Sequence, residues 1–278
     1  MKQRKLIVAL LAASVLAACG TKEETTEQQV EQQVEQHQEE VTLDVKEQAE
    51  SFKQFAEAQM VDFVADTERL ASLVKEGKLE EAQKLYPLVA MYYERMQPLA
   101  SHFEELDKKI NGAFIAGSKQ DGTGFQRLAY GLFTDKKTGS YEEVATQLVA
   151  DVKTLQKELP ALDVSTNNVL AAGVLMLDKL ANERLIAASS ANDEVYTVKA
   201  QTEAAEELVK IFMPRALPES ATAATEKIAA LNELVAYYEV GKEDYVNYSF
   251  FTTKQKDELI IAVKEVQQAL QAMNDSIE

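Results

Sequence analysis

The stretch that decides the fold runs from Lys78 to Phe133, where two helix-forming segments flank a polar loop. It contains Lys78-Leu79-Glu80-Glu81-Ala82, Tyr92-Tyr93-Glu94-Arg95-Met96-Gln97-Pro98, Leu106-Asp107 and Gly122-Thr123-Gly124-Phe125-Gln126-Arg127-Leu128-Ala129. Between Leu79 and Phe103 the apolar residues recur at three- and four-residue steps, which indicates an amphipathic helix. Pro87 and Pro98 each remove a helical hydrogen bond, so we expect kinks or a break near them.

The chain on either side of this stretch carries the same helical periodicity. We expect helices over about 42–76, 79–103, 123–133, 140–160, 165–188, 194–213, 221–239 and 252–277, with a loop over 107–122. Capping boxes at Ser140 and Thr252 and a cap at Ser165 mark three of the helix starts. No alternating run of strand length competes with these helices. The predicted fold is all-α, with two packed bundles of about four helices each, over roughly 42–160 and 161–278.

The first 19 residues have the pattern of a lipoprotein signal peptide. A basic segment with Lys2, Arg4 and Lys5 precedes an apolar core over residues 6–15, which is too short to span a bilayer as a helix. Leu16-Ala17-Ala18-Cys19 then forms a lipobox. We expect cleavage before Cys19, lipidation of its thiol, and a mature protein anchored by its lipid to the extracytoplasmic face of the cell membrane.

Residues 20–41 are rich in Glu, Gln and Thr and hold too few apolar side chains to form a core. We expect a disordered acidic stalk there, followed by the helical domain over 42–278. Cys19 is the only cysteine of the chain, so no disulfide framework is available to this domain.

The net charge of the chain argues against anionic binding partners. The chain has 46 acidic and 29 basic residues, a formal charge of −17, and the signal peptide would remove three of the basic ones. Such a surface repels phosphate groups and anionic lipid headgroups. The composition therefore argues against nucleic-acid binding and against a polybasic membrane interface.

The motifs quoted above resemble one family, the imelysin-like lipoproteins of the EfeO/EfeM type. That family has a Tyr-Glu-Arg segment, a Leu-Asp loop and a Thr-Gly-Phe-His-Arg-x-Glu helix that supplies a His-x-x-Glu metal site. Residues 123–125 and Arg127 match the helix motif, whereas Gln126 replaces the histidine and Ala129 the glutamate. The segment from Tyr245 to Leu259 resembles the C-terminal family pattern, and the chain has no room for the cupredoxin domain of the longer EfeO form.

The resemblance implies a binding protein that delivers iron or another divalent cation to an iron permease, alongside a haem peroxidase. It implies a metal site altered by the two substitutions, because an amide oxygen suits a hard cation but lacks the basic nitrogen of histidine. The positions that remain as candidate metal ligands are Glu94, Gln126, Glu183 and Asp193. No cofactor follows with certainty from the sequence.

Other functions are weighed against this one. Eight tyrosines could instead line a cleft for a polysaccharide or protein partner: Tyr92, Tyr93, Tyr130, Tyr141, Tyr237, Tyr238, Tyr245 and Tyr248. His102 and Glu105 have helical chelate spacing but lack a third ligand. The sequence carries no His-Glu-x-x-His, Gly-x-Ser-x-Gly or P-loop motif, so we expect no enzymatic activity.

Overall fold

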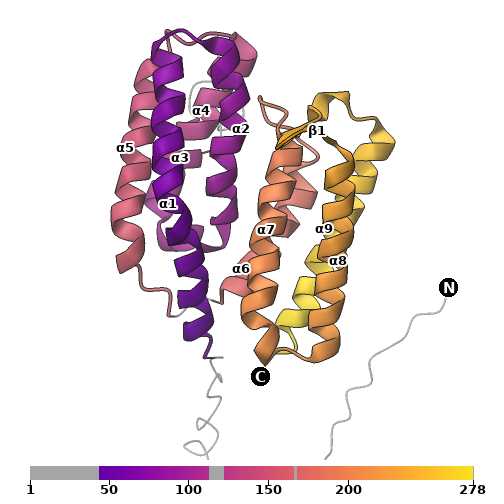
Figure 1. Ribbon diagram of the computed structural model, residues 1–278. Coiled ribbons are helices and arrows are strands. Elements are labelled where there is room, and N and C mark those ends of the chain that lie inside the picture. Colours follow the sequence, from indigo (N-terminus) through magenta and orange to yellow (C-terminus); the bar gives the residue numbers. More distant parts are fainter. Residues whose placement is uncertain (1–43, 113–121, 166–167, 278) are drawn as a thin grey trace, which may run out of the picture. The chain divides into compact units, whose positions relative to one another are not determined.

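The computed structural model describes residues 44–112, 122–165 and 168–277. Leu43–Glu278 forms one compact unit (Figure 1). Lipidation of Cys19, the signal peptide and the stalk all concern residues outside the described ones. Within the described residues, each helix is either too short or too polar to span a bilayer.

The first bundle holds the motif stretch. Its elements are α1 (Lys46–Lys75), α2 (Leu79–Arg95), the 3₁₀ helix η2 (Gln97–His102), α3 (Glu104–Asn111), α4 (Gly124–Ala129), the π-helical η3 (Tyr130–Asp135), α5 (Glu142–Glu158) and η4 (Leu159–Ala161). Helix α1 packs against α2 and α5, and the short α3 and α4 pack against each other and against α5. This bundle occupies the indigo-to-rose side of Figure 1.

The second bundle is formed by the C-terminal part of the chain. It contains α6 (Val169–Lys179), the π-helical η5 (Leu180–Arg184), α7 (Glu194–Phe212), η6 (Met213–Arg215), α8 (Pro218–Tyr237), η7 (Tyr248–Phe250) and α9 (Thr253–Asn274). Helix α9 packs against α8 and α6, and α7 packs against α8. The two bundles meet mainly where α2 lies against α7 and where η2 lies against α6.

This architecture confirms the predicted all-α fold of two bundles. A two-stranded antiparallel hairpin, β1 (Glu239–Gly241) with β2 (Asp244–Tyr245), was not expected. Its strands are too short to show an alternating pattern in the sequence. Pro98 does end the second helix, since a 3₁₀ helix begins at Gln97, whereas Pro87 lies inside α2 without ending it.

Several predicted helix ends were wrong. Helix α3 covers Glu104–Asn111 and so extends into the expected loop 107–122. The predicted cap at Ser140 does not form, because α5 begins after Tyr141 without a side-chain cap. Asn168, and not Ser165, caps α6, accepting from the backbone N–H groups of Leu170 and Ala171. The capping box of Thr252 with Gln255 is confirmed.

The pieces of the motif stretch are held together by buried tyrosines. The Tyr93 hydroxyl donates to Asp107, and the Tyr86 hydroxyl donates to the backbone carbonyl of Phe125 at 3.0 Å. The Phe125 ring is 2% exposed and stacks on Phe63 with ring centroids 6.1 Å apart. Phe125 therefore anchors α4 in the core and fixes where its neighbour Gln126 can point.

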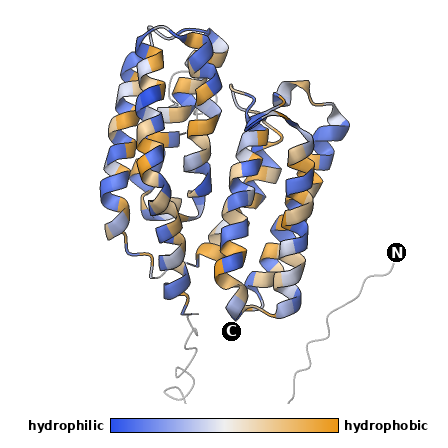
Figure 2. Cartoon of the chain, viewed as in Figure 1, coloured by the Kyte–Doolittle hydropathy of each residue, from blue (hydrophilic) through white to orange (hydrophobic). Residues whose placement is uncertain are grey.

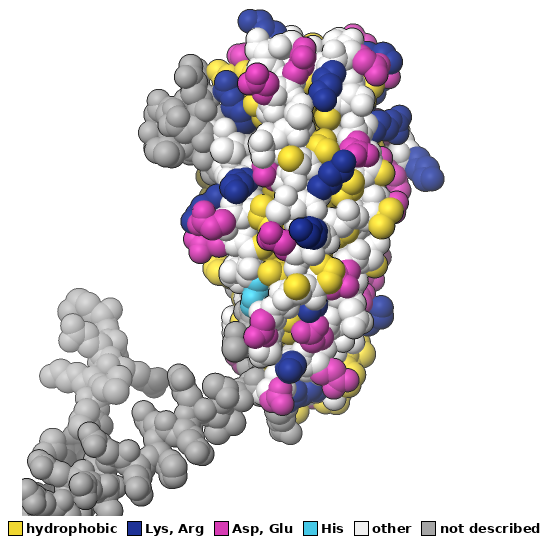
Figure 3. Space-filling view, turned by 90° about the vertical axis from the view of Figure 1, so that its left-hand side faces the viewer, with side chains coloured by type: hydrophobic (Ala, Val, Ile, Leu, Met, Phe, Trp, Pro, Cys, Tyr) yellow, Lys and Arg dark blue, Asp and Glu magenta, His cyan; other side chains and the backbone are white. Residues whose placement is uncertain are grey.

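Hydropathy follows this packing (Figure 2): apolar positions line the helix faces turned into each bundle, while polar ones face outward. On the face shown in Figure 3, acidic and basic side chains are interspersed rather than gathered into a patch of one sign.

Candidate functional site

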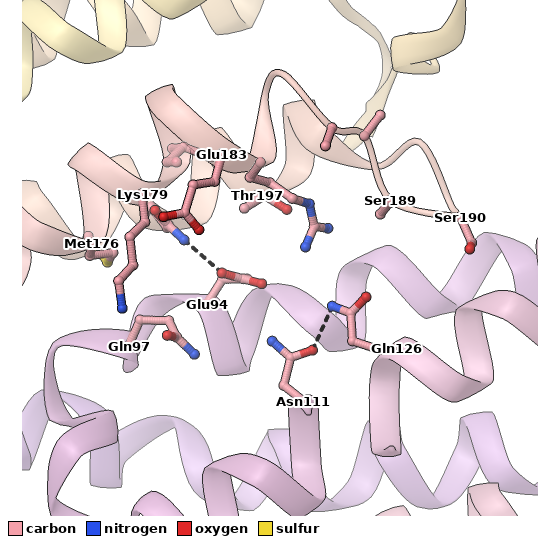
Figure 4. A pocket seen from close by; sticks show the side chains of 15 residues that line it. Glu94, Gln97, Asn111, Gln126, Met176, Lys179, Glu183, Ser189, Ser190 and Thr197 are labelled. Atoms are coloured by element: carbon pink, nitrogen blue, oxygen red, sulfur yellow. Dashed lines mark hydrogen bonds between the residues drawn. The ribbon is translucent and has the colours of Figure 1, made fainter. Parts of the chain in front are cut away.

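A polar cavity of about 660 Å³ lies between the two bundles (Figure 4). The first bundle lines it with Glu94, Gln97, Asn111 and Gln126, and the second with residues from α6, η5, the following turn and α7. Aromatic rings are absent from its described lining. The cavity is therefore suited to a ligand bound through charges and hydrogen bonds and not through ring stacking.

Glu94 is the buried carboxylate of this cavity. It lies near the end of α2, is 8% exposed, and its Oε2 accepts from Gln201 Nε2 at 2.8 Å. This hydrogen bond links α2 of the first bundle to α7 of the second. Burial raises the pKa of the Glu94 carboxyl, and Arg184 and the bond from Gln201 offset only part of that effect.

Gln126 reaches the cavity from α4. Its Nε2 donates to Asn111 Oδ1 at 3.0 Å, so two of the amides on the first-bundle wall bind each other. Ala129, one helical turn later, is 1% exposed and belongs to the hydrophobic core. A larger side chain at position 129 would therefore lie in the packed interior of the bundle. The side chain at position 126 lines the cavity instead.

Glu183 and Arg184 come from the π-helical segment η5. The backbone N–H of Leu185 donates to the carbonyl of Leu180 at 3.0 Å, the wider spacing of a π-helix. The Glu183 side chain is exposed, and in Figure 4 it points into the cavity toward Glu94. Arg184 is 22% exposed and also lines the cavity.

Arg184 is paired with two consecutive carboxylates at the start of α7. Its Nη2 lies 3.0 Å from Asp193 Oδ1 and its Nε 3.3 Å from Glu194 Oε1. Burial alone would lower the pKa of the guanidinium, but Asp193, Glu94 and Glu194 outweigh that effect and raise it. Burial raises the pKa of the Glu194 carboxyl, as does the adjacent Asp193. Glu194 is 0% exposed, and its Oε2 has no partner among the described residues.

Three of the four predicted ligand positions, Glu94, Gln126 and Glu183, thus line one cavity. Asp193 does not line it. Its Oδ1 is engaged by Arg184 and, at 2.7 Å, by the Ser189 hydroxyl. Among the described residues, no three His, Cys, Asp or Glu side chains are grouped so as to hold a metal ion.

Three residues of the cavity lining were not predicted from the sequence: Gln201, Thr197 and Arg184. Gln201 is 7% exposed and Thr197 4% exposed, and both line the cavity. They lie four residues apart on α7, so they share one face of that helix. Their burial is a consequence of packing against α2, and the sequence of α7 alone gives no signal for it.

The His102 and Glu105 pair does not have the geometry of a helical chelate. His102 ends η2 and Glu105 lies in the first turn of α3, with a break at Phe103 between them. Glu105 pairs instead with Lys108 at 3.0 Å. Burial lowers the pKa of the His102 imidazole, whose Nε2 has no partner among the described residues.

Of the eight tyrosines considered as cleft residues, Tyr245 lines a second hollow of about 510 Å³ beside the β-hairpin. Phe133, Tyr196 and several charged side chains also line this hollow, and Tyr196 was not among the eight. The rings of Tyr196 and Tyr245 meet edge to face with centroids 5.0 Å apart. Tyr93, Tyr141 and Tyr248, also considered as cleft residues, are no more than 2% exposed and belong to the core.

Two packed helical bundles with a cavity between them define the class of this protein. The chain belongs to the imelysin family, whose sequence model matches residues 48–276. Its resemblance to EfeO/EfeM-type proteins is confirmed: it is 26% identical to an "Efem/EfeO family lipoprotein" of Staphylococcus haemolyticus over 97% of this chain and 98% of that protein. A relative of the same name from Staphylococcus aureus (strain COL) is 28% identical, over 63% of this chain and 64% of that protein.

Proposed function

We propose that this protein is a lipid-anchored, extracytoplasmic binding protein that captures a metal cation in the cavity between its bundles. The observation that carries the proposal is the convergence of Glu94, Gln126 and Glu183, from three separate elements, on one cavity. These positions came from a family resemblance and not from proximity in the sequence. Oxygen donors from both bundles can surround a cation there.

By the same resemblance, the role is in the uptake of iron or another divalent cation, with delivery to a permease alongside a haem peroxidase. The site differs from that of the family, because Gln126 and Ala129 supply neither the imidazole nor the carboxylate of the His-x-x-Glu motif. No catalytic step is assigned to the protein, although imelysin relatives carry a peptidase name.

The lipid anchor is part of the proposal. Cys19 ends a lipobox, and the relatives with which the chain shares most of its length are named lipoproteins. Substituting Cys19 by serine in the natural host should release the protein from the membrane fraction. Retention of the Cys19→Ser variant in that fraction would refute anchoring through this residue.

Equilibrium dialysis of the full-length protein against ferrous, ferric, zinc, manganese(II) and calcium ions tests the cation proposal. We expect one equivalent of cation per chain, and loss of binding in the variant Glu94→Gln. That change keeps the size of the side chain and its ability to accept from Gln201. Failure of every cation to bind the natural protein would refute the proposal.

A second candidate function is binding of a polysaccharide or protein partner, and the hollow lined by Phe133, Tyr196 and Tyr245 favours it. Aromatic faces beside charged groups suit sugars and peptides. The experiment is binding of cell-wall polysaccharide fragments to the natural protein and to Tyr196→Ala. If the natural protein binds them and the variant does not, this function gains support, and equal binding by both would exclude the hollow.

A further inference from the structure

Gln201 is the cavity residue whose hydrogen bonding is incomplete. Its Nε2 donates to Glu94, but its Oε1 is buried and has no partner among the described residues. Because the amide nitrogen donates to Glu94, the carbonyl oxygen is the atom of this amide that is left without a hydrogen-bond partner. A buried acceptor without a donor is costly, and a bound cation would satisfy it.

Further oxygen-bearing side chains line the same cavity as Gln201. Thr197 precedes Gln201 by one turn of α7 and lines the cavity at 4% exposure. Glu94 uses one oxygen for the bond from Gln201, which leaves the other for a ligand. Glu183 points toward Glu94 from the opposite wall (Figure 4), and no ion pair engages its side chain among the described residues.

The charges around the cavity leave room for a divalent cation. Glu94 and Glu183 line it, and Asp193 and Glu194 adjoin it through Arg184. Lys179 and Arg184 are the basic side chains of the lining. The ion pairs of Arg184 are made with Asp193 and Glu194, which lie outside the lining, so its charge is already balanced there and Glu94 is left without an ion pair among the described residues.

We infer that a hard divalent cation, of the calcium or manganese(II) kind, binds in the cavity where α2 meets α7, with Glu94 and the Gln201 carbonyl as its principal ligands. Thr197 and Glu183 supply further oxygens. Carboxylate, amide and hydroxyl oxygens favour such cations over zinc or copper, which prefer imidazole or thiolate. This inference rests on the proposed function and adds to it the ligands, their position and the class of cation.

The test compares two isosteric variants of the full-length protein, Gln201→Met and Gln97→Met. Both remove one amide from the lining of the same cavity, but from opposite walls. Calcium and manganese(II) affinities are measured by equilibrium dialysis, with zinc as the comparison ion and thermal unfolding as the check on folding. We expect Gln201→Met to weaken calcium or manganese(II) binding at least about tenfold, and Gln97→Met to change it by less than about threefold.

The possible results distinguish a failure of the proposed function from a failure of this inference alone. If no cation binds the natural protein, the proposed function fails and the inference fails with it. If a cation binds but Gln97→Met is the damaging variant, or if zinc binds more tightly than calcium and manganese(II), the cation function stands and the subsite formed by Glu94 and Gln201 is refuted. Should Gln201→Met fail to fold, Gln201→Glu replaces it, because an added carboxylate on this wall must raise calcium affinity. Unchanged or lower affinity would overturn the inference.

Discussion

The two walls of the cavity are both polar, but they differ in how completely they satisfy themselves. On the first-bundle wall, Gln126 and Asn111 bind each other. On the second-bundle wall, Arg184 forms ion pairs with Asp193 and Glu194, which do not line the cavity, while Gln201 keeps a buried oxygen without a partner among the described residues. An amide pair satisfies its own hydrogen bonds, whereas an unpartnered buried acceptor keeps an oxygen available to a ligand. The difference supports the proposed site at Glu94 and Gln201, although the family motif lies on α4.

Removing Arg184 should disrupt the second-bundle wall of the cavity and cause the largest loss of stability among the predicted changes. Arg184→Met leaves Asp193 and Glu194 buried without their cation, at 6% and 0% exposure of their side chains. Breaking such a pair from one side costs about 3 kcal/mol of unfolding free energy. Urea denaturation followed by circular dichroism measures it.

The matched control is Lys227→Met, which removes an ion pair with Glu265 in which the two side chains are 46% and 48% exposed. Exposed pairs contribute less than about 1 kcal/mol. Equal losses in the two variants would show that the Arg184 cluster is no more important than a surface pair.

The first wall depends on Gly124, at the start of α4. Its φ is +49°, and an added Cβ would lie 1.9 Å from the backbone oxygen of Ile110. Backbone atoms cannot rotate away as a side chain does, so Gly124→Ala should cost about 2 kcal/mol or more. Thermal unfolding measures the loss. Gly139→Ala is the control, because no atom lies within 4 Å of its added Cβ. A variant Gly124→Ala as stable as this control would contradict the packing described for α4.

The two walls also show which features of the fold and of the candidate site can be predicted from the sequence. The helical period gave the two bundles, and the family resemblance gave Glu94, Gln126 and Glu183, which lie in one cavity. The ends of helices were less predictable, because the capping oxygen of α6 belongs to Asn168 and not to the equally plausible Ser165. Local sequence offers several candidate caps, and tertiary packing selects one.

Gln201 and Arg184 could not be predicted as cavity residues from the sequence, for a different reason. Helix α7 contacts helices of both bundles, so its polar residues are divided between solvent and a buried interface. A period of 3.6 identifies which residues share a face but not what covers that face. Only the contact with α2 turns Gln201 from a surface glutamine into the partner of Glu94.

Gln126→His sharpens the comparison by giving the first wall a nitrogen donor. An imidazole favours zinc over calcium, so we expect the ratio of zinc to calcium affinity to rise about tenfold. Gln126 is the better position for this change than Ala129, which is 1% exposed in the core. Equilibrium dialysis with both ions measures the ratio. Gln97→His, which opens on the same cavity, is the control, and an equal response there would mean that any added imidazole suffices.

The smallest effect is expected at Lys179, which lines this cavity and a neighbouring hollow of about 560 Å³ that reaches Glu104 and Asp107. Its side chain is exposed and has no ion pair within the described part of the chain, so its charge is screened by water. Lys179→Gln removes a positive charge that competes with the bound cation, and calcium affinity should rise about two- to fivefold at low salt. The gain should shrink as salt is added, which separates an electrostatic effect from a change of shape. Lys210→Gln is the control, because that exposed lysine lies on α7 but does not line the cavity and pairs with Glu207 at 3.1 Å. A fall in affinity in Lys179→Gln would mean that the lysine helps to hold the ligand, and the bound species would then have to carry negative charge.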